Sequence, residues 1–479
     1  MKAVLFALNS SYVHTNLAVR CLKNHVDTKY PGKHEIIIVE KNLKDKTDEV
    51  LYTLYSLNAE IYGFSCYIFN INEMLFYAQN LKKLLPEVKI LFGGPEASYD
   101  SKYLVERNPF IDNVITQEGE DAFENYLEKI PDKQIITGKS YSKFYQKGIE
   151  YDEDNGINGN IAYYESSRGC PYKCSYCLSS IEKGIRSKSA IKTLEDILEY
   201  EKFKSISIIK FVDRTFNYDI DRANEILKGL LDEKYTKTYH LEVRPELFNN
   251  EMFDILKKFP NNKLQMEIGI QSTNKKTLEA IDRPSNIDNA IKNMKKLRAL
   301  GNIKVHGDLI FGLPYDDITS IGKSYDDIFY ACDELQLGVL KLLKGTKIRN
   351  QEKEFSYVFN NEPPYDIFSN RFLSYENVFI LKRIAALTER YKNSIHFHNS
   401  CEYIIGYFKS PFNFFVGLNK FINYHISTVS QHEAFRKFYE YSSKFVKCYM
   451  KEQEWSIFIQ HLKKDYLVCL NRNAPDYFI

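Results

Sequence analysis

The sequence has no excess of charge of either sign and no long apolar run. Its 479 residues carry 65 Lys and Arg against 63 Asp and Glu, which gives a formal net charge of +2. A protein that binds nucleic acid or an anionic membrane surface usually carries a clear basic excess, so this balance argues against both. No stretch approaches the ~18 apolar residues that a membrane span needs. We therefore expect no nucleic-acid partner and no membrane span.

Tryptophan and cysteine are also scarce. One Trp stands beside 36 Tyr and 32 Phe; an A+T-rich genome accounts for this aromatic excess, which is weak evidence for stacking platforms. Nine cysteines are too few for a disulfide scaffold, and an odd total leaves at least one unpaired. The opening MKAVLFAL is shorter than a signal-peptide apolar region and is followed by polar NSSYVHTN. These features favour a reduced, cytoplasmic protein.

The first 130 residues alternate β-rich and helix-periodic segments. Strands are predicted at 2–8, 35–40, 60–66, 88–94 and 112–116, and helices near 14–28, 45–57, 70–85, 98–107 and 119–130. Alternation of nearly continuous apolar strands with helices predicts a parallel sheet covered on both faces. Such a doubly wound, flavodoxin-like or Rossmann-like sheet binds ligands beyond the carboxyl ends of its strands.

A second series of strands follows an acidic, Gly- and Asn-rich stretch at 151–160, which has the composition of a linker. Strands are predicted at 161–166, 206–212, 238–243, 264–270, 304–311 and 335–341, and helices near 190–204, 219–234, 251–259, 274–299 and 320–333. Six strand–helix units predict an open or partial parallel barrel with its site at the strand carboxyl ends. From about residue 371 onward the pattern is helical, with aromatic stripes that are typical of a core.

Three cysteines form a compact motif directly after the first strand of the second series. Cys170, Cys174 and Cys177 have the spacing C-x3-C-x2-C. Nine cysteines placed at random would give this pattern only about 0.003 times in a chain of this length. Thiolates are soft ligands that suit zinc or an iron–sulfur cluster. Structural zinc needs a fourth protein ligand, and no Cys or His follows at the usual spacing, so we favour a cluster with one open iron and keep zinc as the alternative.

The stretch GCPYKCSYC, with Tyr176 before the last cysteine, resembles the signature of radical S-adenosylmethionine (SAM) enzymes, and the similarity continues along all six predicted strands. The resemblance implies that Cys170, Cys174 and Cys177 hold a [4Fe–4S] cluster whose open iron binds SAM. Cleavage of SAM then gives a 5′-deoxyadenosyl radical that abstracts a substrate hydrogen. It also implies an external electron donor of the flavodoxin or ferredoxin type. An oxygen-labile cluster makes a reduced, anaerobic setting a requirement.

Later strand ends resemble the SAM contacts of that family, in FVDRTFN, LEVRPE, MEIGIQS and HGDLIFGLP. Arg244 resembles the partner of the SAM carboxylate, a task that suits a guanidinium, and the backbone of Phe311 and Gly312 would approach the adenine. Read without the resemblance, Arg244 could form an ordinary ion pair, Asp213 could cap the next helix, and Glu267 could satisfy a buried polar network. The candidate SAM contacts are Tyr176, Asp213, Arg244, Glu267, Gln271, Phe311 and Gly312.

A doubly wound domain before such a barrel resembles the cobalamin-binding subclass, including its GGPE and GEGE patterns. Glycines there permit close backbone approach to a bulky ligand. The D-x-H-x-x-G motif is absent, so we expect base-off cobalamin without a histidine ligand and keep His14 as a minor candidate. The alternative is a domain that binds no corrinoid, while the absence of G-x-G-x-x-G disfavours nucleotide binding. The candidate cobalamin contacts are Ser10, Ser11, His14, Ser65, Tyr67, Gly93, Gly94, Pro95, Glu96, Gly119 and Glu120.

The layout resembles the branch in which a helical region of unknown function follows the barrel. It implies an α/β fold with four consecutive parts: a Rossmann-like (flavodoxin-like) cobalamin-binding domain at 1–150, a linker at 151–160, a partial (β/α)6 radical SAM barrel of the TIM type at 161–345, and a mostly α-helical domain at 346–479 for substrate recognition or as a lid. A small molecule or a peptide is expected as the substrate.

Cobalamin and SAM at one site imply methylation of an unactivated carbon or of phosphorus through methylcobalamin. The same subclass contains enzymes that close or rearrange rings or oxidise their substrates without net methyl transfer. Sulfur insertion would need a further cluster, and the six other cysteines are isolated. A non-enzymatic corrinoid carrier or sensor is the alternative of another class, but it would not need the cysteine triplet.

Overall fold

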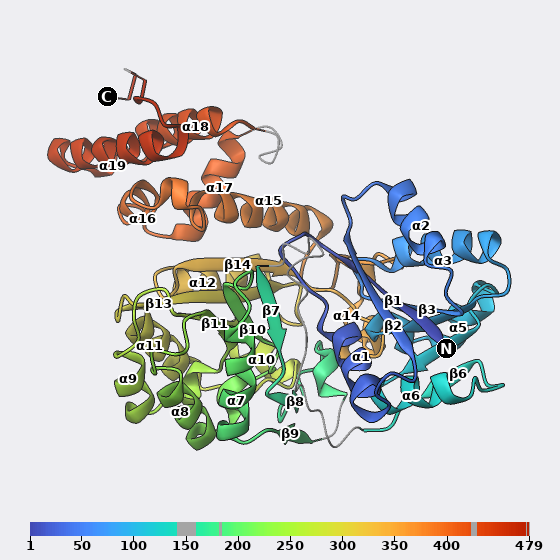
Figure 1. Ribbon diagram of the computed structural model, residues 1–479. Coiled ribbons are helices and arrows are strands. Elements are labelled where there is room, and N and C mark those ends of the chain that lie inside the picture. Colours follow the sequence, from blue (N-terminus) through green and yellow to red (C-terminus); the bar gives the residue numbers. More distant parts are fainter. Residues whose placement is uncertain (141–159, 182–183, 423–428, 476, 479) are drawn as a thin grey trace.

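The computed structural model describes residues 1–140, 160–181, 184–422, 429–475 and 477–478, and these form three bodies (Figure 1). Two α/β parts lie side by side, and a helical part rests above the one that contains β7 and β10–β14. The predicted linker at 151–160 lies, apart from its last residue, outside the described residues. No helix in the described parts of the chain is long and apolar enough to cross a membrane.

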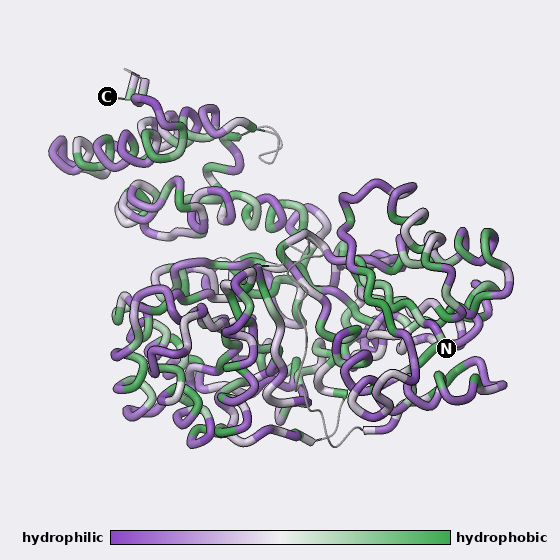
Figure 2. The backbone as a smooth tube through the Cα atoms, viewed as in Figure 1, coloured by the Kyte–Doolittle hydropathy of each residue, from purple (hydrophilic) through white to green (hydrophobic). Residues whose placement is uncertain are grey.

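The first sheet contains six parallel strands in the order β2-β1-β3-β4-β5-β6. Alternate residues of β1 enter two apolar clusters, one with Val19 and Phe123 and the other with Val50 and Met74, so both faces are covered by helices as predicted. Figure 2 shows apolar residues concentrated along these central strands. The strands are β1 (Lys2–Asn9), β2 (Glu35–Asn42), β3 (Ile61–Ser65), β4 (Lys89–Gly93), β5 (Asn113–Thr116) and β6 (Ile135–Thr137), and the helices are α1 (Leu17–Lys29), α2 (Thr47–Ser56), α3 (Ile71–Leu84), α4 (Pro95–Ser98), α5 (Ser101–Arg107) and α6 (Glu120–Glu128).

The second sheet is also parallel, in the order β14-β13-β12-β11-β10-β7. Its two end strands do not pair with each other, so the six-stranded barrel is open, as predicted. A short antiparallel pair, β8 (Ser167–Gly169) with β9 (Ile185–Ser187), flanks the cysteine loop. The strands are β7 (Ile161–Tyr164), β10 (Ile208–Phe211), β11 (Thr238–Glu242), β12 (Leu264–Gln271), β13 (Ile303–Phe311) and β14 (Glu334–Val339), and the helices are α7 (Ala190–Glu201), α8 (Ile220–Gly229), α9 (Asn250–Leu256), α10 (Lys275–Ala280), α11 (Ile287–Arg298) and α12 (Ile318–Phe329).

Strands β12 and β13 alternate strictly between buried and half-buried residues. The buried set, such as Val305 and Leu309, packs in the main apolar cluster of the chain. The half-buried set points the other way, because successive strand side chains face opposite sides of the sheet. It includes Glu267, His306 and Asp308, so the open barrel has a polar interior.

The chain after β14 is helical, as predicted, apart from a two-stranded pair, β15 (Val358–Phe359) with β16 (Ile367–Ser369). Helix α15 lies against β14, and α17 packs against both α15 and α12. The aromatic stripe around Phe412, Phe414 and Phe415 is buried, which makes it core as expected. The helices are α13 (Lys347–Asn350), α14 (Glu352–Phe355), α15 (Tyr375–Tyr391), α16 (Ser400–Ile405), α17 (Pro411–Phe421), α18 (Gln431–Phe445) and α19 (Glu452–Leu470).

The loop after β1 joins the two sheets. The N–H of Ile161 donates to the carbonyl of Val13 at 3.0 Å, and the Thr15 hydroxyl donates to the Ile161 carbonyl at 3.1 Å. His14 and Ile161 form a parallel bridge, so this loop lies along the free edge of β7. The carboxyl end of the first sheet is thereby held next to the first barrel strand.

Candidate functional site

The three cysteines of the motif line one cavity of about 200 Å³ at the carboxyl ends of the barrel strands. The loop after β7 brings the sulfur atoms, and β10 to β13 bring the charged and polar side chains. The lining residues are Cys170, Tyr172, Cys174, Tyr176, Cys177, Ser180, Arg214, Thr215, Glu242, Val243, Arg244, Glu267, Gly269, Gln271, Arg283 and Asp308. Tyr176, Arg244, Glu267, Gln271 and the three cysteines, all predicted from the sequence, therefore meet at one place.

Buried hydrogen bonds hold the start of the cysteine loop. The Asp213 carboxylate accepts from the Ser166 N–H at 2.8 Å and from the hydroxyls of Ser166 and Ser167 at 2.5 and 2.7 Å. Gly169 has φ +94°, and a Cβ at this position would lie 2.2 Å from the carbonyl oxygen of Gly184, so only glycine fits between the two strands of the β8–β9 pair. These contacts fix where the loop leaves β7.

The cysteine thiols fit a cluster better than a single zinc ion. All three are free, and Cys174 is buried while the other two are partly exposed. Sulfur atoms around tetrahedral zinc lie about 3.8 Å apart, because each Zn–S bond is about 2.3 Å. Within the described residues, the three sulfur atoms do not all lie within 4.8 Å of one another. A multi-iron cluster, which binds each sulfur through a different iron, accommodates this wider spacing.

Arg244 is buried beside the cysteines and has one nitrogen to spare. Its Nε donates to Glu246 at 2.7 Å, and its guanidinium stacks 3.8 Å from the Tyr172 ring centroid. Its Nη1 is buried without a hydrogen-bond partner, as is Oε1 of Gln271, which lines the same cavity. Buried polar atoms are normally satisfied. The cavity therefore presents one donor and one acceptor to a ligand, and these suit the carboxylate and the polar groups of SAM.

Three carboxyl groups form the barrel side of the cavity. Hydrogen bonding from His240, with the Lys210 ammonium 2.9 Å away, lowers the pKa of Glu267 to about 2. Burial, together with the charges of Glu267 and Glu242, raises the pKa of Asp308 to about 8. Burial also raises the pKa of Glu242. At neutral pH, Glu267 is therefore ionised while Asp308 holds its proton and can donate a hydrogen bond into the cavity.

Three of the predicted SAM contacts lie elsewhere. Asp213 is fully buried under the cysteine loop, and its neighbour Arg214 lines the cavity instead. Phe311 and Gly312 do not line the cavity; the Gly312 carbonyl accepts from Tyr357 at 3.1 Å and from Asn370 at 2.9 Å. The end of β13 therefore anchors the segment that leads into the helical part. Contact of these three residues with SAM stays a prediction.

The predicted cobalamin contacts gather at the carboxyl edge of the first sheet, but three of them make contacts between domains. The Tyr163 hydroxyl of β7 lies 2.8 Å from Nδ1 of His14. Glu96 accepts from the Tyr365 hydroxyl and lies 3.0 Å from the Lys344 ammonium. Glu120 pairs with Arg168 at 2.8 Å. In this structure these three side chains hold the first domain against the barrel and the following segment.

The other predicted cobalamin contacts lie in the four loops beyond β1, β3, β4 and β5. Ser65 is buried and accepts from Asn16 at 3.3 Å, and the Tyr67 ring stacks on Phe69. Gly94 has φ +102°, and a Cβ there would lie 2.6 Å from the Cys66 carbonyl oxygen, so the loop after β4 requires glycine. Ser10, Ser11, Gly93, Pro95 and Gly119 are exposed or half-buried at the same edge. Contact of these residues with a corrin remains a prediction.

Sequence reasoning missed nine lining residues: Tyr172, Ser180, Arg214, Thr215, Glu242, Val243, Gly269, Arg283 and Asp308. Strand alternation could have found two of them, because Asp308 and Glu242 share the interior face of their strands with predicted or polar positions. Arg283 ends the motif segment TLEAIDR, but nothing in its spacing indicates that it returns to the cysteines. Its position depends on the turn that follows α10.

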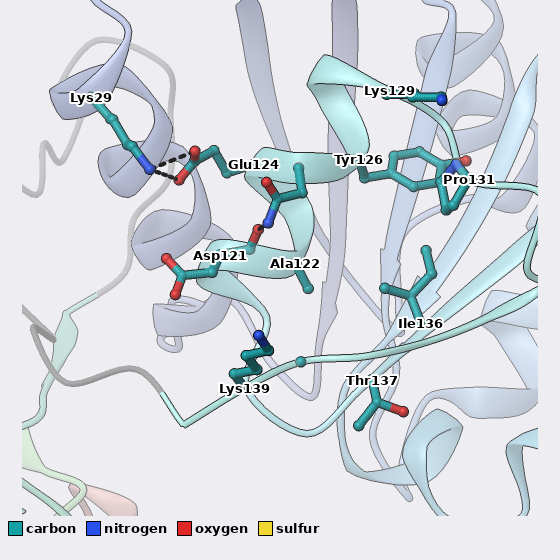
Figure 3. A pocket seen from close by; sticks show the side chains of 12 residues that line it. Lys29, Asp121, Ala122, Glu124, Tyr126, Lys129, Pro131, Ile136, Thr137 and Lys139 are labelled. Atoms are coloured by element: carbon teal, nitrogen blue, oxygen red, sulfur yellow. Dashed lines mark hydrogen bonds and ion pairs between the residues drawn. The ribbon is translucent and has the colours of Figure 1, made fainter.

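A larger cavity of about 450 Å³ lies between α1, α6 and β6 and contains none of the motif residues (Figure 3). His25, Asp121 and Glu124 could together face a cation here. However, the Lys29 ammonium already lies 2.6 and 2.8 Å from the two Glu124 oxygens, as the dashed lines show. We therefore place the functional site at the cysteine cavity.

Comparison with known families gives three consecutive matches along the chain. Residues 4–127 match the B12 binding domain, and residues 164–328 match the radical SAM superfamily. Residues 353–479 match a family described as a protein of unknown function (DUF4080). The first match covers β1–β5 of the first sheet, and the second runs from the end of β7 to α12 of the open barrel. They confirm the cofactor set predicted from the sequence, namely a [4Fe–4S] cluster, SAM and cobalamin.

Curated relatives match the chain at low sequence identity. The chain is 24% identical over 343 residues to the cobalamin-dependent radical SAM methyltransferase TokK of Streptomyces tokunonensis, covering 64% of this chain and 50% of TokK. The chain thus spans about half the length of the first curated relatives it matches.

Solved structures show the same fold. The cobalamin-dependent SAM radical enzyme OxsB aligns with a TM-score of 0.63 at 14% identity, over 99% of this chain and 82% of OxsB. The radical SAM methyltransferase TsrM of Kitasatospora setae aligns with a TM-score of 0.59 at 14% identity, over 73% of this chain and 75% of TsrM. Residues 164–328 thus match the radical SAM superfamily, and they follow a part of the chain that matches the B12 binding domain.

Proposed function

We propose that this protein is a cobalamin-dependent radical SAM enzyme that methylates an unactivated carbon or phosphorus centre of a small molecule or peptide. The observation that carries the proposal is the meeting of Cys170, Cys174 and Cys177 with Arg244 in one cavity of the open barrel. The edge of the B12 binding domain lies beside the first barrel strand. A corrin at that edge and SAM in the cavity would share one space.

Each group of residues has a separate task in this proposal. The three cysteines would hold a [4Fe–4S] cluster that, when bound, supplies the electron for SAM cleavage. Nη1 of Arg244 would donate to the SAM carboxylate, and Oε1 of Gln271 would accept from its polar groups. Asp308, which keeps its proton at neutral pH because burial raises its pKa to about 8, would donate to SAM or substrate. The neighbouring domain would exclude water from the reacting centre.

The remaining parts complete the proposal. Residues 1–150 would bind cobalamin through the loops after β1, β3, β4 and β5, 161–345 would form the radical SAM core, and the helical residues 346–479 would recognise the substrate or act as a lid. An external donor of the flavodoxin or ferredoxin type would supply electrons in a cytoplasmic setting. A near-neutral charge, +2 overall, supports a substrate other than nucleic acid.

The test is anaerobic incubation of the reconstituted protein with cobalamin, SAM carrying a labelled methyl group, a reductant and candidate substrates. These candidates are chosen from the peptides and pathways that neighbouring genes encode. Methyl transfer predicts label in the product together with 5′-deoxyadenosine. An unlabelled product with 5′-deoxyadenosine would replace methylation by rearrangement, ring closure or oxidation. Cobalamin binding without any SAM cleavage would contradict the enzyme proposal and leave a corrinoid carrier or sensor.

A further inference from the structure

Arg283 contacts the most deeply buried of the three cysteines. It follows α10, and its Nη1 donates to Sγ of Cys174 at 3.5 Å. Its Nη2 donates to the carbonyl of Gly269 on β12. The guanidinium thus has one edge on the barrel and one on the cysteine loop.

Arg283 has no carboxylate within ion-pair distance in the described residues, although Glu246 and Asp308 act on its charge from farther away. Within the described parts of the chain, no Asp or Glu side chain forms an ion pair with it, although it lines the cavity beside Arg244, which pairs with Glu246 at 2.5 Å. A guanidinium that is mostly removed from water is costly unless an anion faces it. The group in hydrogen-bond contact with its Nη1 is the Cys174 sulfur. The positive charge of Arg283 therefore lies directly beside a cysteine of the motif.

The backbone around Arg283 is fixed to the cysteine loop itself. The N–H of Ser175 donates to the Ile281 carbonyl at 2.9 Å, and the N–H of Arg283 donates to Leu278 at 2.8 Å. Asp282 accepts from Lys347 at 2.7 Å. Because the Ser175–Ile281 hydrogen bond holds the arginine segment against the cysteine loop, the N–H···S contact is preorganised.

We propose that Arg283 is a positioning residue that donates a hydrogen bond to Cys174 and thereby raises the reduction potential of the cluster bound there. This inference rests on the cluster of the proposed function. Reduction passes one electron from the external donor to the cluster and adds one negative charge. Arg283 stabilises that charge through its N–H group and its positive charge, since hydrogen bonds to sulfur are among the main determinants of cluster potential.

The experiment compares wild type with Arg283→Leu, Arg283→Lys and Arg214→Leu in the reconstituted protein without SAM. Iron and sulfide content and the absorbance and paramagnetic signals show whether a cluster is present, and a redox titration gives its midpoint. Arg214 provides a matched control, because it lines the same cavity but is exposed and makes no contact with a cysteine sulfur. The Arg214→Leu substitution removes the same charge without removing the N–H···S bond.

We expect Arg283→Leu to lower the equilibrium constant for one-electron reduction of the cluster at least tenfold. This corresponds to a fall of about 59 mV in the midpoint potential. Arg283→Lys should restore part of it, and Arg214→Leu should shift it less. If the leucine variant does not take up a cluster, the neutral Arg283→Gln replaces it and should lie below the lysine variant. Equal shifts at 283 and 214 would overturn the N–H···S role.

Two further outcomes separate this inference from the function on which it rests. Wild type and Arg283→Leu could both hold a cluster with the same midpoint potential while the leucine variant binds SAM more weakly. In that case Arg283 binds SAM and its proposed role is wrong. If wild type itself takes up no cluster, the proposed function fails, and with it the premise of the test.

Discussion

Arg168 connects the B12 binding domain to the barrel. Its replacement by methionine tests how much this side chain contributes to the docking of the two domains. Its guanidinium donates to Glu118 at 2.7 Å, to Glu120 at 2.8 Å and to Glu165 at 2.7 and 3.0 Å. Glu118 and Glu120 belong to the first domain, while Glu165 follows β7. One residue thus joins carboxylates from both sides of the junction.

The expected magnitude follows from burial. No more than 14% of any of these four side chains is exposed, so the small value of a surface ion pair does not apply. Removing one partner of a buried pair costs about 3–5 kcal/mol, because the remaining charges lose their compensation. At about 1.4 kcal/mol per factor of ten, the equilibrium between docked and undocked domains should fall roughly 10²- to 10³-fold or more.

The pH dependence of the stability loss in Arg168→Met gives a second, independent check. Burial raises the pKa of Glu165, and Arg168 opposes that rise. Without the guanidinium this pKa rises further. A carboxyl whose pKa is higher in the folded state is penalised above its unfolded pKa of about 4.3 and is relieved as the pH falls through its folded value. The deficit of Arg168→Met should therefore be smaller at pH 5.5 than at pH 8.

The assay is urea unfolding of the cofactor-free protein, followed by circular dichroism at both pH values. Arg107→Met on the exposed face of α5 is the matched control and should change stability by no more than about 0.5 kcal/mol. Adding Glu120→Gln to Arg168→Met should recover part of the loss. Separation of the two domains should be the first unfolding transition in urea. If Arg168→Met leaves the midpoint of this transition unchanged, or lowers it equally at both pH values, this account of the junction is refuted.

Three other replacements test separate parts of the structure. Arg244→Lys keeps the charge but loses the planar fork, so SAM binding should weaken at least tenfold, or about 1.5–3 kcal/mol, without loss of iron; unchanged affinity would remove Arg244 from the SAM site. Asp308→Asn should gain stability relative to wild type as the pH rises from about 4 to about 8, because the raised pKa of Asp308 penalises its ionised form. Thermal unfolding measures this gain, and a difference in stability between the two proteins that stays constant across this range would contradict it. Asp465 is 2% exposed and accepts from the N–H and side chains of Asn399 and Ser400, so Asp465→Ala should destabilise the helical part by about 2–3 kcal/mol. The fluorescence of Trp455, the single tryptophan and a member of the same helix α19, should report this loss, and an unchanged transition would be evidence against the anchor.

The two parallel sheets could be predicted because most of their strands are apolar and are separated by periodic helices. Shorter elements escaped prediction: β6 and the β8–β9 pair have three residues each, too few to show a period. The helix expected at 274–299 is two helices, α10 and α11, because Pro284 lies between them and proline disrupts a helix interior.

The cysteine motif could be read from sequence because its chemistry is encoded in local spacing. The buried contacts of Asp213, and those of His14, Glu96 and Glu120, could not be read in this way. The direction of Asp213 depends on how β10 ends, since one residue of shift exchanges the two faces of a strand. The other three are set by the docking of two domains, which brings together residues far apart in the chain, such as Glu96 and Tyr365.

The most direct test of the central claim is SAM cleavage by wild type and by the Cys170→Ala, Cys174→Ala, Cys177→Ala triple variant after anaerobic reconstitution with iron, sulfide and a strong reductant. Wild type should hold one [4Fe–4S] cluster and release 5′-deoxyadenosine, and the triple variant should show neither cluster absorbance nor cleavage. Circular dichroism checks that the variant is folded. A folded triple variant that still cleaves SAM would contradict the assignment of these cysteines as the cluster ligands.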